Sequence, residues 1–258
     1  MTIVNDIKPR GTDSAYVNDK PFDEAKAELE KAHYHIPSLE ENAQLRIQEG
    51  KDAYVSRNGN WVKEDFLYVP GKDKVIFTKN SPIMLHPKEA TQAHRDGKEF
   101  YVSQEDLDEA LTNSIEIPYS QKPIPTNRFG QDEITLFAFG DNAKSYGEFL
   151  KDAKINEMPI VSASKDYADK QSQTFARKLW FRGLGGRSGL GGCSGSLHSD
   201  YRSRGVRSEV ALATEPHENF SGNESEIIKY SQILSNVRNG SLPNSQLEEV
   251  IGFLDKLR

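Results

Sequence analysis

The sequence predicts a mixed α+β fold of the α/β class, with an N-terminal α+β unit that contains a β-hairpin and a C-terminal βαβ-containing unit that ends in a helical hairpin. Three observations predict it. Helix-capping signals alternate with short β-branched and aromatic runs along the chain. An Asn-Gly pair at 58–59 separates two such runs. A Pro-rich stretch at 117–127 divides the chain near its middle.

The chain is expected to divide into four segments. Residues 1–20 are polar, show no apolar period and predict a flexible arm. Residues 21–118 predict an α+β domain, and residues 119–127 predict a Pro-rich linker. Residues 128–258 predict a βαβ-containing domain with a Gly-rich loop and C-terminal helices.

The N-terminal unit carries helix and strand signals in turn. Ser38 opens a capping box with Glu41, and Ser103 precedes an acidic first turn, so both residues predict helix starts. Helices are expected at 23–34, 38–49, 88–95 and 103–111. Strands are expected at 53–56, 61–69, 74–79 and 98–102, with a hairpin turn at Asn58-Gly59 between the first two.

The C-terminal unit alternates in the same way. The continuous apolar run 134–139 is typical of a strand buried on both faces, and the stripe along 167–181 has helical spacing. Strands are expected at 134–139, 159–163 and 209–213, and helices at 142–154 and 167–181. Capping boxes at Ser221 and Ser245 predict two terminal helices, which either pack on this domain or mediate homo-oligomerisation.

Composition and charge restrict the class of protein. The start of the chain has no apolar core of a secretory signal, and no apolar run approaches the roughly 18 residues of a membrane span. The single Cys193 forms no internal disulfide, so we expect a soluble cytoplasmic protein that does not contact a membrane. The net charge is −6, yet residues 177–207 hold seven basic residues against one acid. This asymmetry predicts a local electropositive patch.

The most unusual stretch is glycine-rich. Residues 183–195 read GLGGRS-GLGGCS-G, two copies of a hexapeptide and the start of a third. Bare Gly N–H groups beside arginines favour a phosphate-cradling loop, whereas low complexity favours a flexible linker. The P-loop pattern is absent, the third Gly of the dinucleotide fingerprint is missing, and we expect a helix rather than a strand before the run. Cys193 lies in a G-x-C-x-G pattern, which we interpret as an ordinary thiol because no strand is expected before it.

Two carboxylates are weak catalytic candidates. Asp141 and Asp166 each follow an expected core strand, at the end where open α/β sheets bind ligands. There they could hold Mg²⁺ together with substrate phosphates. Both also fit helix N-caps, where Asp accepts a backbone hydrogen bond. No other metal site is predicted, and no cofactor is indicated.

The leading functional hypothesis is binding of a phosphate-bearing small molecule or nucleic acid by the basic segment. The candidate ligand-binding residues are Arg177, Arg182, Arg187, Arg202, Arg204 and Arg207. One alternative is a metal-dependent phosphotransfer or hydrolytic enzyme that uses Asp141 and Asp166. Another is a protein-interaction module without catalysis. The sequence leaves open whether the protein is an enzyme.

Overall fold

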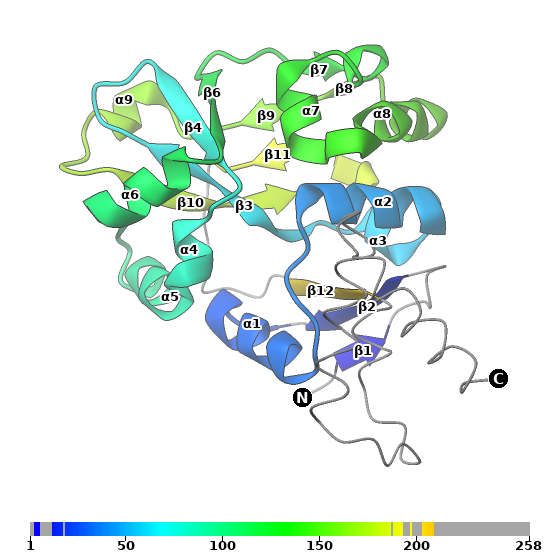
Figure 1. Ribbon diagram of the computed structural model, residues 1–258, viewed down its shortest axis with the longest axis horizontal. Helices are drawn as coiled ribbons and strands as arrows, with labels where there is room; N and C mark the ends of the chain where they lie inside the picture. Colours follow the sequence, from blue (N-terminus) through cyan, green and yellow to red (C-terminus); the bar gives the residue numbers. More distant parts are fainter. Residues whose placement is uncertain are drawn as a thin grey trace, which may run out of the picture. The chain divides into compact units, whose positions relative to one another are not determined.

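The computed structural model describes residues 3–5, 12–17, 19–186, 188–192, 197 and 203–208 (Figure 1). Two expected features, the strand at 209–213 and the terminal helices after Ser221, lie outside the described residues. So does the homo-oligomer contact expected from those helices. The described residues all belong to one compact unit, Met1–Glu209.

A seven-stranded mixed sheet forms the centre of the unit. Its strands are, in sheet order, β6 (Ser114–Pro118), β4 (Lys74–Thr78), β3 (Asn60–Tyr68), β10 (Phe175–Phe181), β11 (Leu190–Gly191) and β9 (Ile160–Val161), with β5 (Phe100–Tyr101) also paired to β10. The pairs are antiparallel except β11–β9, which is parallel. The α+β class is therefore confirmed, and the N-terminal hairpin is formed by β3 and β4.

β10 corrects the predicted helix at 167–181. Only Lys165–Ala168 (α9) is helical there, and residues 175–181 form a strand. A central strand that is buried on both faces has a nearly continuous apolar sequence. Such a sequence also contains apolar residues at helical spacing, so the pattern alone does not distinguish the two structures. Pairing with β3 on one edge, and with β5 and β11 on the other, decides in favour of the strand.

Two predicted strands are helices. Residues 134–139 belong to α7 (Glu133–Phe139), whose N-cap Asp132 accepts hydrogen bonds from the backbone of Ile134 and Thr135. The predicted βαβ unit therefore lacks its first strand. Residues 54–57 form α3 (Tyr54–Arg57), so the Asn-Gly pair links a helix to β3 instead of turning a hairpin.

The predicted helices of the N-terminal half, and the helix near 142–154, are present in the structure. Ser38 caps the second of them with both hydrogen bonds of a capping box. Ser103 accepts a hydrogen bond from the Asp106 backbone. The helices are α1 (Phe22–Lys31), α2 (Leu39–Glu49), α5 (Pro87–Arg95), α6 (Gln104–Leu111) and α8 (Ala143–Asp152). A further short helix is α4 (Pro82–Leu85).

A second, three-stranded sheet contains part of the expected flexible arm. Its order is β1 (Ile3–Asn5), β2 (Thr12–Val17) and β12 (Ser203–Ser208). Ala15, Tyr16 and Val17 of β2 are buried, so this part of the arm is held in the fold. The register pairs Val17 with Ser203 across β2 and β12, segments far apart in the sequence.

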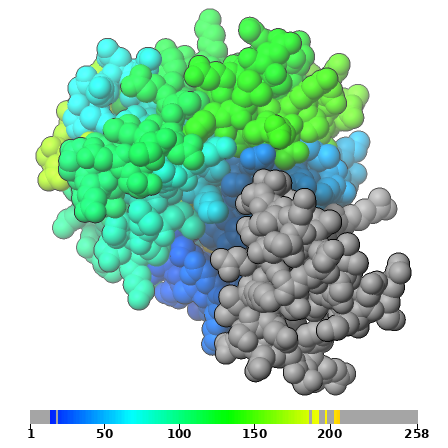
Figure 2. All heavy atoms as spheres, in the orientation of Figure 1, coloured from blue at the N-terminus to red at the C-terminus, as the bar shows by residue number. Residues whose placement is uncertain are grey.

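The Pro-rich segment packs into the same core as its neighbours. Its Ile117 and Ile124 are buried in one hydrophobic cluster together with Phe66 from before it and Leu190 from after it. β7 (Ile124–Pro125) pairs with β8 (Glu157–Met158). Strands from both sides of the segment also share the main sheet, so 119–127 does not separate two cores. Figure 2 shows the side chains from about 100 to 150, in green, along the upper part of the view.

Glu64 of β3 is a buried carboxyl group at the start of α2. Its two carboxylate oxygens accept hydrogen bonds from the Leu39 backbone at 3.0 and 3.1 Å. Burial raises its pKa from 4.5 to about 7, and the Leu39 hydrogen bond and the charge of Lys178 offset only part of that effect.

This raised pKa predicts a pH-dependent stability. Between pH 4.5 and about 7 the folded protein keeps a proton that the unfolded chain releases. The free energy of unfolding therefore falls as the pH rises through this window, by roughly 1.4 kcal/mol per pH unit from this group. Glu64→Gln retains an acceptor but does not titrate, so we expect its stability to fall less steeply. Urea unfolding at about pH 5 and about pH 8 measures the difference. Glu157→Gln, an exposed control, should follow the wild type, and parallel curves for Glu64→Gln and wild type would contradict the assignment.

Candidate functional site

The first glycine hexad forms the turn between β10 and β11. Phe181 pairs with Leu190 at its base, Arg182 donates its backbone N–H to the Gly189 carbonyl at 2.9 Å, and Ser188 donates to the Gly183 carbonyl at 3.2 Å. We call residues 182–189 the hairpin turn. It follows a strand, which corrects the expected helix. The dinucleotide fingerprint is still not met, because a second strand rather than a helix follows.

Several glycines are required by close packing. A Cβ on Gly183 would lie 2.2 Å from the Arg57 carbonyl oxygen, and one on Gly189 would lie 2.7 Å from the Pro159 carbonyl oxygen. In the second hexad, a Cβ on Gly192 would lie 2.6 Å from the Phe66 ring. These three glycines thus let the backbone approach its neighbours closely. Cys193 lies outside the described residues.

A buried arginine from α2 holds the hairpin turn from inside. Arg46 is 0% exposed, and its Nη1 donates to the Arg182 carbonyl at 3.0 Å and to Tyr146 Oη at 2.9 Å. Ser188 Oγ lies 3.4 Å from the same Nη1 and 2.9 Å from Tyr146 Oη. The guanidinium also lies 3.7 Å from the centroid of the Phe181 ring. These contacts join α2, α8 and the turn.

No sequence signal marks Arg46 as a functional residue. It lies in an ordinary helical segment, and only the fold reveals that it is buried. Ser188 lies inside the hexad, and its φ of +36° is rare for a residue with a side chain. Its neighbours Gly183 and Gly189 already marked this segment as conformationally unusual.

The six candidate arginines do not form one patch in the part of the chain that the structure describes. Arg177 is paired with Glu99, and Arg204 is buried, with Nη2 donating to Ser14 Oγ at 2.7 Å and lying 3.6 Å from Glu49. Arg187 and Arg202 lie outside the described residues, and Arg207 is described only as backbone in β12.

The Arg177–Glu99 pair is part of the framework. Arg177 Nε donates to Glu99 Oε2 at 3.2 Å, and Tyr167 Oη donates to Glu99 Oε1 at 2.6 Å. Burial raises the pKa of Glu99, but the hydrogen bonds from Arg177 and Tyr167 outweigh it, so the pKa is lowered. A guanidinium engaged in this way has little charge left for an external anion.

Arg182 differs from the paired arginines Arg177 and Arg204. Its side chain is half-buried, and no carboxylate within ion-pairing distance is found for it among the described residues. Its backbone is fixed at both ends, because the N–H donates to Gly189 and the carbonyl accepts from Arg46. The hairpin turn therefore holds Arg182 at a defined position beside the exposed Gly185.

Asp141 and Asp166 lie on different elements. Asp141 is exposed in the 3₁₀ turn η2 (Gly140–Asn142) before α8, and Asp166 is exposed in the first turn of α9. Neither is an N-cap, since Asn142 and Ser164 occupy those positions. Figure 1 shows α8 and α9 at opposite sides of the view. The structure does not bring the two carboxylates into one cleft.

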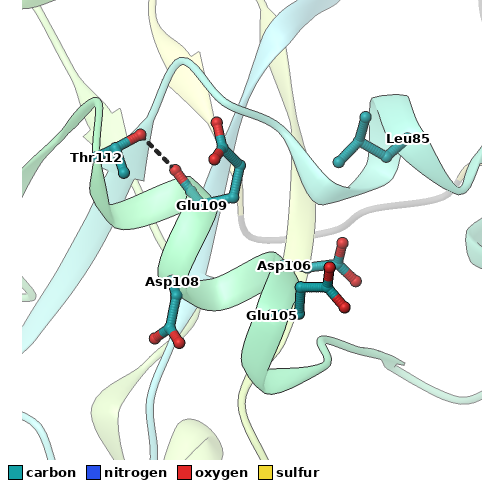
Figure 3. A pocket seen from close by; sticks show the side chains of 6 residues that line it. All are labelled: Leu85, Glu105, Asp106, Asp108, Glu109 and Thr112. Carbon is teal, nitrogen blue, oxygen red and sulfur yellow. Dashed lines mark hydrogen bonds between the residues drawn. The ribbon is translucent and has the colours of Figure 1, made fainter.

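An acidic groove lies between α4 and α6 (Figure 3). Its volume is about 660 Å³, and its lining residues are Leu85, Glu105, Asp106, Asp108, Glu109 and Thr112. Asp106 also contacts His86 Nε2 at 3.2 Å and accepts a hydrogen bond from Ser103 Oγ, and these contacts lower its pKa. Among the described residues no group of three or more His, Cys, Asp or Glu side chains is placed to hold a metal ion.

Comparison with known proteins supports the fold. No protein-family model and no curated protein sequence matches the chain. A solved structure described as "Accommodation of massive sequence variation in Nanoarchaeota by the C-type lectin fold" is similar, with a TM-score of 0.59 and 19% sequence identity. The similarity covers 78% of this chain and 99% of that chain. At this identity it shows a shared fold, that of a C-type lectin.

In the part of the chain that the structure describes, no helix combines the length and apolar character that crossing a membrane requires.

The packing of the glycines gives a prediction within a single hexad. Gly183→Ala should lower the free energy of unfolding by about 1–3 kcal/mol, because its Cβ would meet the fixed backbone of Arg57. Gly185→Ala is the matched control, since nothing lies within 4 Å of a Cβ there. Chemical denaturation of both variants measures the difference. Equal, small effects would instead favour the flexible-linker interpretation.

Proposed function

We propose that this protein is a binding protein that holds a phosphate-bearing ligand, nucleic acid included, at the hairpin turn between β10 and β11. The observation that carries the proposal is Arg182. Its side chain has no carboxylate partner among the described residues, and its backbone is fixed by Gly189 and Arg46. An uncompensated guanidinium on a fixed backbone is well suited to charge-assisted hydrogen bonds with phosphate oxygens.

The charge around the turn supports an anionic partner. Arg46 adds a second positive charge directly beneath Arg182, and no acidic side chain is paired with either of them in the described residues. Gly185 is exposed, and nothing lies within 4 Å of a Cβ placed on it, so a ligand can approach the backbone there. By sequence, Arg187, Arg202 and Arg207 are further candidates for the same partner. Arg177 and Arg204 are assigned to the framework.

The fold comparison agrees with this separation of framework residues from proposed binding residues. The similar solved structure is described as a C-type lectin fold that accommodates massive sequence variation. In this chain the buried Arg46 and the packed glycines would be framework, and Arg182 with the exposed tip of the turn would be the presented surface. A metal-dependent enzyme using Asp141 and Asp166 is not proposed, because the two carboxylates lie on separate elements.

The test is binding as a function of salt. Fluorescence anisotropy with labelled single-stranded RNA, and separately with a labelled nucleoside triphosphate, should give affinities that fall as NaCl rises. Arg182→Ala should weaken RNA binding at every salt concentration and make the slope of log affinity against log salt less steep by about one unit.

The control removes the same charge elsewhere. Arg95 lies on α5 and is paired with the exposed Glu24 at 3.3 Å. Arg95→Ala should therefore leave both affinity and slope close to wild type. Absence of binding to either ligand, or the same loss in both variants, would refute the proposal.

A further inference from the structure

We propose that Arg46 is the centre of a buried site for a small oxyanion, a carboxylate or phosphate group, beneath the hairpin turn. The site is distinct from the surface contact proposed for Arg182, and it stands even if the protein binds no nucleic acid. Arg46 makes only some of the hydrogen bonds that a buried guanidinium needs.

The donors of Arg46 are used unequally. Nη1 donates to Tyr146 Oη and to the Arg182 carbonyl, whereas Nε and Nη2 are buried without a hydrogen-bond partner. The N–H groups of Nε and Nη2 point from the same edge of a guanidinium. That edge is the one that binds two oxygens of a carboxylate or phosphate in parallel. The unpaired donors thus form one complete bidentate edge.

The charge of Arg46 is also unbalanced. Glu49 lies on the same helix, α2, and has a buried side chain, but its carboxylate lies 3.6 Å from a different arginine, the buried Arg204. No carboxylate lies within ion-pairing distance of Arg46 in the described part of the chain. The Phe181 ring centroid lies 3.7 Å from the guanidinium carbon and attracts the cation, but it supplies no oxygen or nitrogen acceptor to Nε and Nη2.

Arginine has no neutral state to relieve this situation. An arginine side chain stays charged in proteins even when it is buried. A buried, charged donor without an acceptor is costly, and such groups in proteins are paired or bind an anion. An oxyanion on the Nε–Nη2 edge would satisfy both donors and neutralise the charge. Chloride could neutralise the charge but has no two oxygens to match the edge.

The direct test uses the intact protein and two salts at equal ionic strength. The ¹⁵Nε–¹Hε resonance of Arg46 should shift saturably when sodium acetate or phosphate replaces sodium chloride at neutral pH. The melting temperature should rise with the concentration of the bound anion. Arg46→Lys keeps the charge but loses the bidentate edge, so it identifies the resonance and should bind acetate about tenfold or more weakly.

Arg182→Lys is the matched control, since it conserves charge at the neighbouring surface position and should respond to acetate as the wild type does. If Arg46→Lys does not fold, through-bond assignment of the wild-type protein identifies the Arg46 resonance, and its response to acetate decides. An Arg46 resonance and a melting temperature that do not distinguish acetate or phosphate from chloride would overturn the proposal, as would a full acetate response in Arg46→Lys. Arg182→Ala should weaken RNA binding and keep the acetate response, so the two proposals fail independently.

Discussion

The pairing of β10 with β3 is the constraint on which the rest of the structure depends. β10 is the strand that contacts β3 on one edge and both β5 and β11 on the other, so it joins the two halves of the sheet. Its residues are buried on both faces, apart from two partly exposed positions. Removing a central strand of this kind would leave backbone groups of three neighbouring strands unpaired in the interior. The hairpin turn is positioned because β10 ends directly beneath it.

Buried charge makes this pairing specific. Lys178 and Asp65 are register partners across β10 and β3, and Lys178 Nζ lies 3.0 Å from Asp65 Oδ1. The ammonium also donates to Ser81 Oγ at 2.9 Å and to the Lys63 carbonyl at 2.8 Å, so its three donors are satisfied. A shift of one residue would place the lysine on the other face of the sheet without these partners. Arg204 is likewise buried near an acid, Glu49, at 3.6 Å, whereas among the described residues no acid is paired with Arg46.

The contrast among the arginines supports the proposed position of the binding site. Sequence charge alone treats six arginines as one basic patch, but an arginine paired inside the fold contributes little field outside it. Arg177 and Arg204 are committed to Glu99 and to Glu49 with Ser14. Arg182 is held in place by its backbone while its side chain has no carboxylate partner among the described residues. A rigid backbone with an unpaired charge reduces the ordering that a ligand must impose, and this preorganisation favours binding.

The sequence by itself determined the α+β class and most of the helices, because capping residues such as Ser38 and Ser103 act locally, through hydrogen bonds within their own first turn. It also marked the glycine hexads and the local excess of arginine. Only the tertiary structure decided that 175–181 is a strand and 133–139 a helix, since both are apolar runs whose state depends on what pairs with them. It alone separated Arg182 from Arg177 and Arg204, and it alone revealed Arg46. Burial and pairing arise between segments about a hundred or more residues apart, as in the contact of Arg46 with Tyr146, and local sequence carries no record of such contacts.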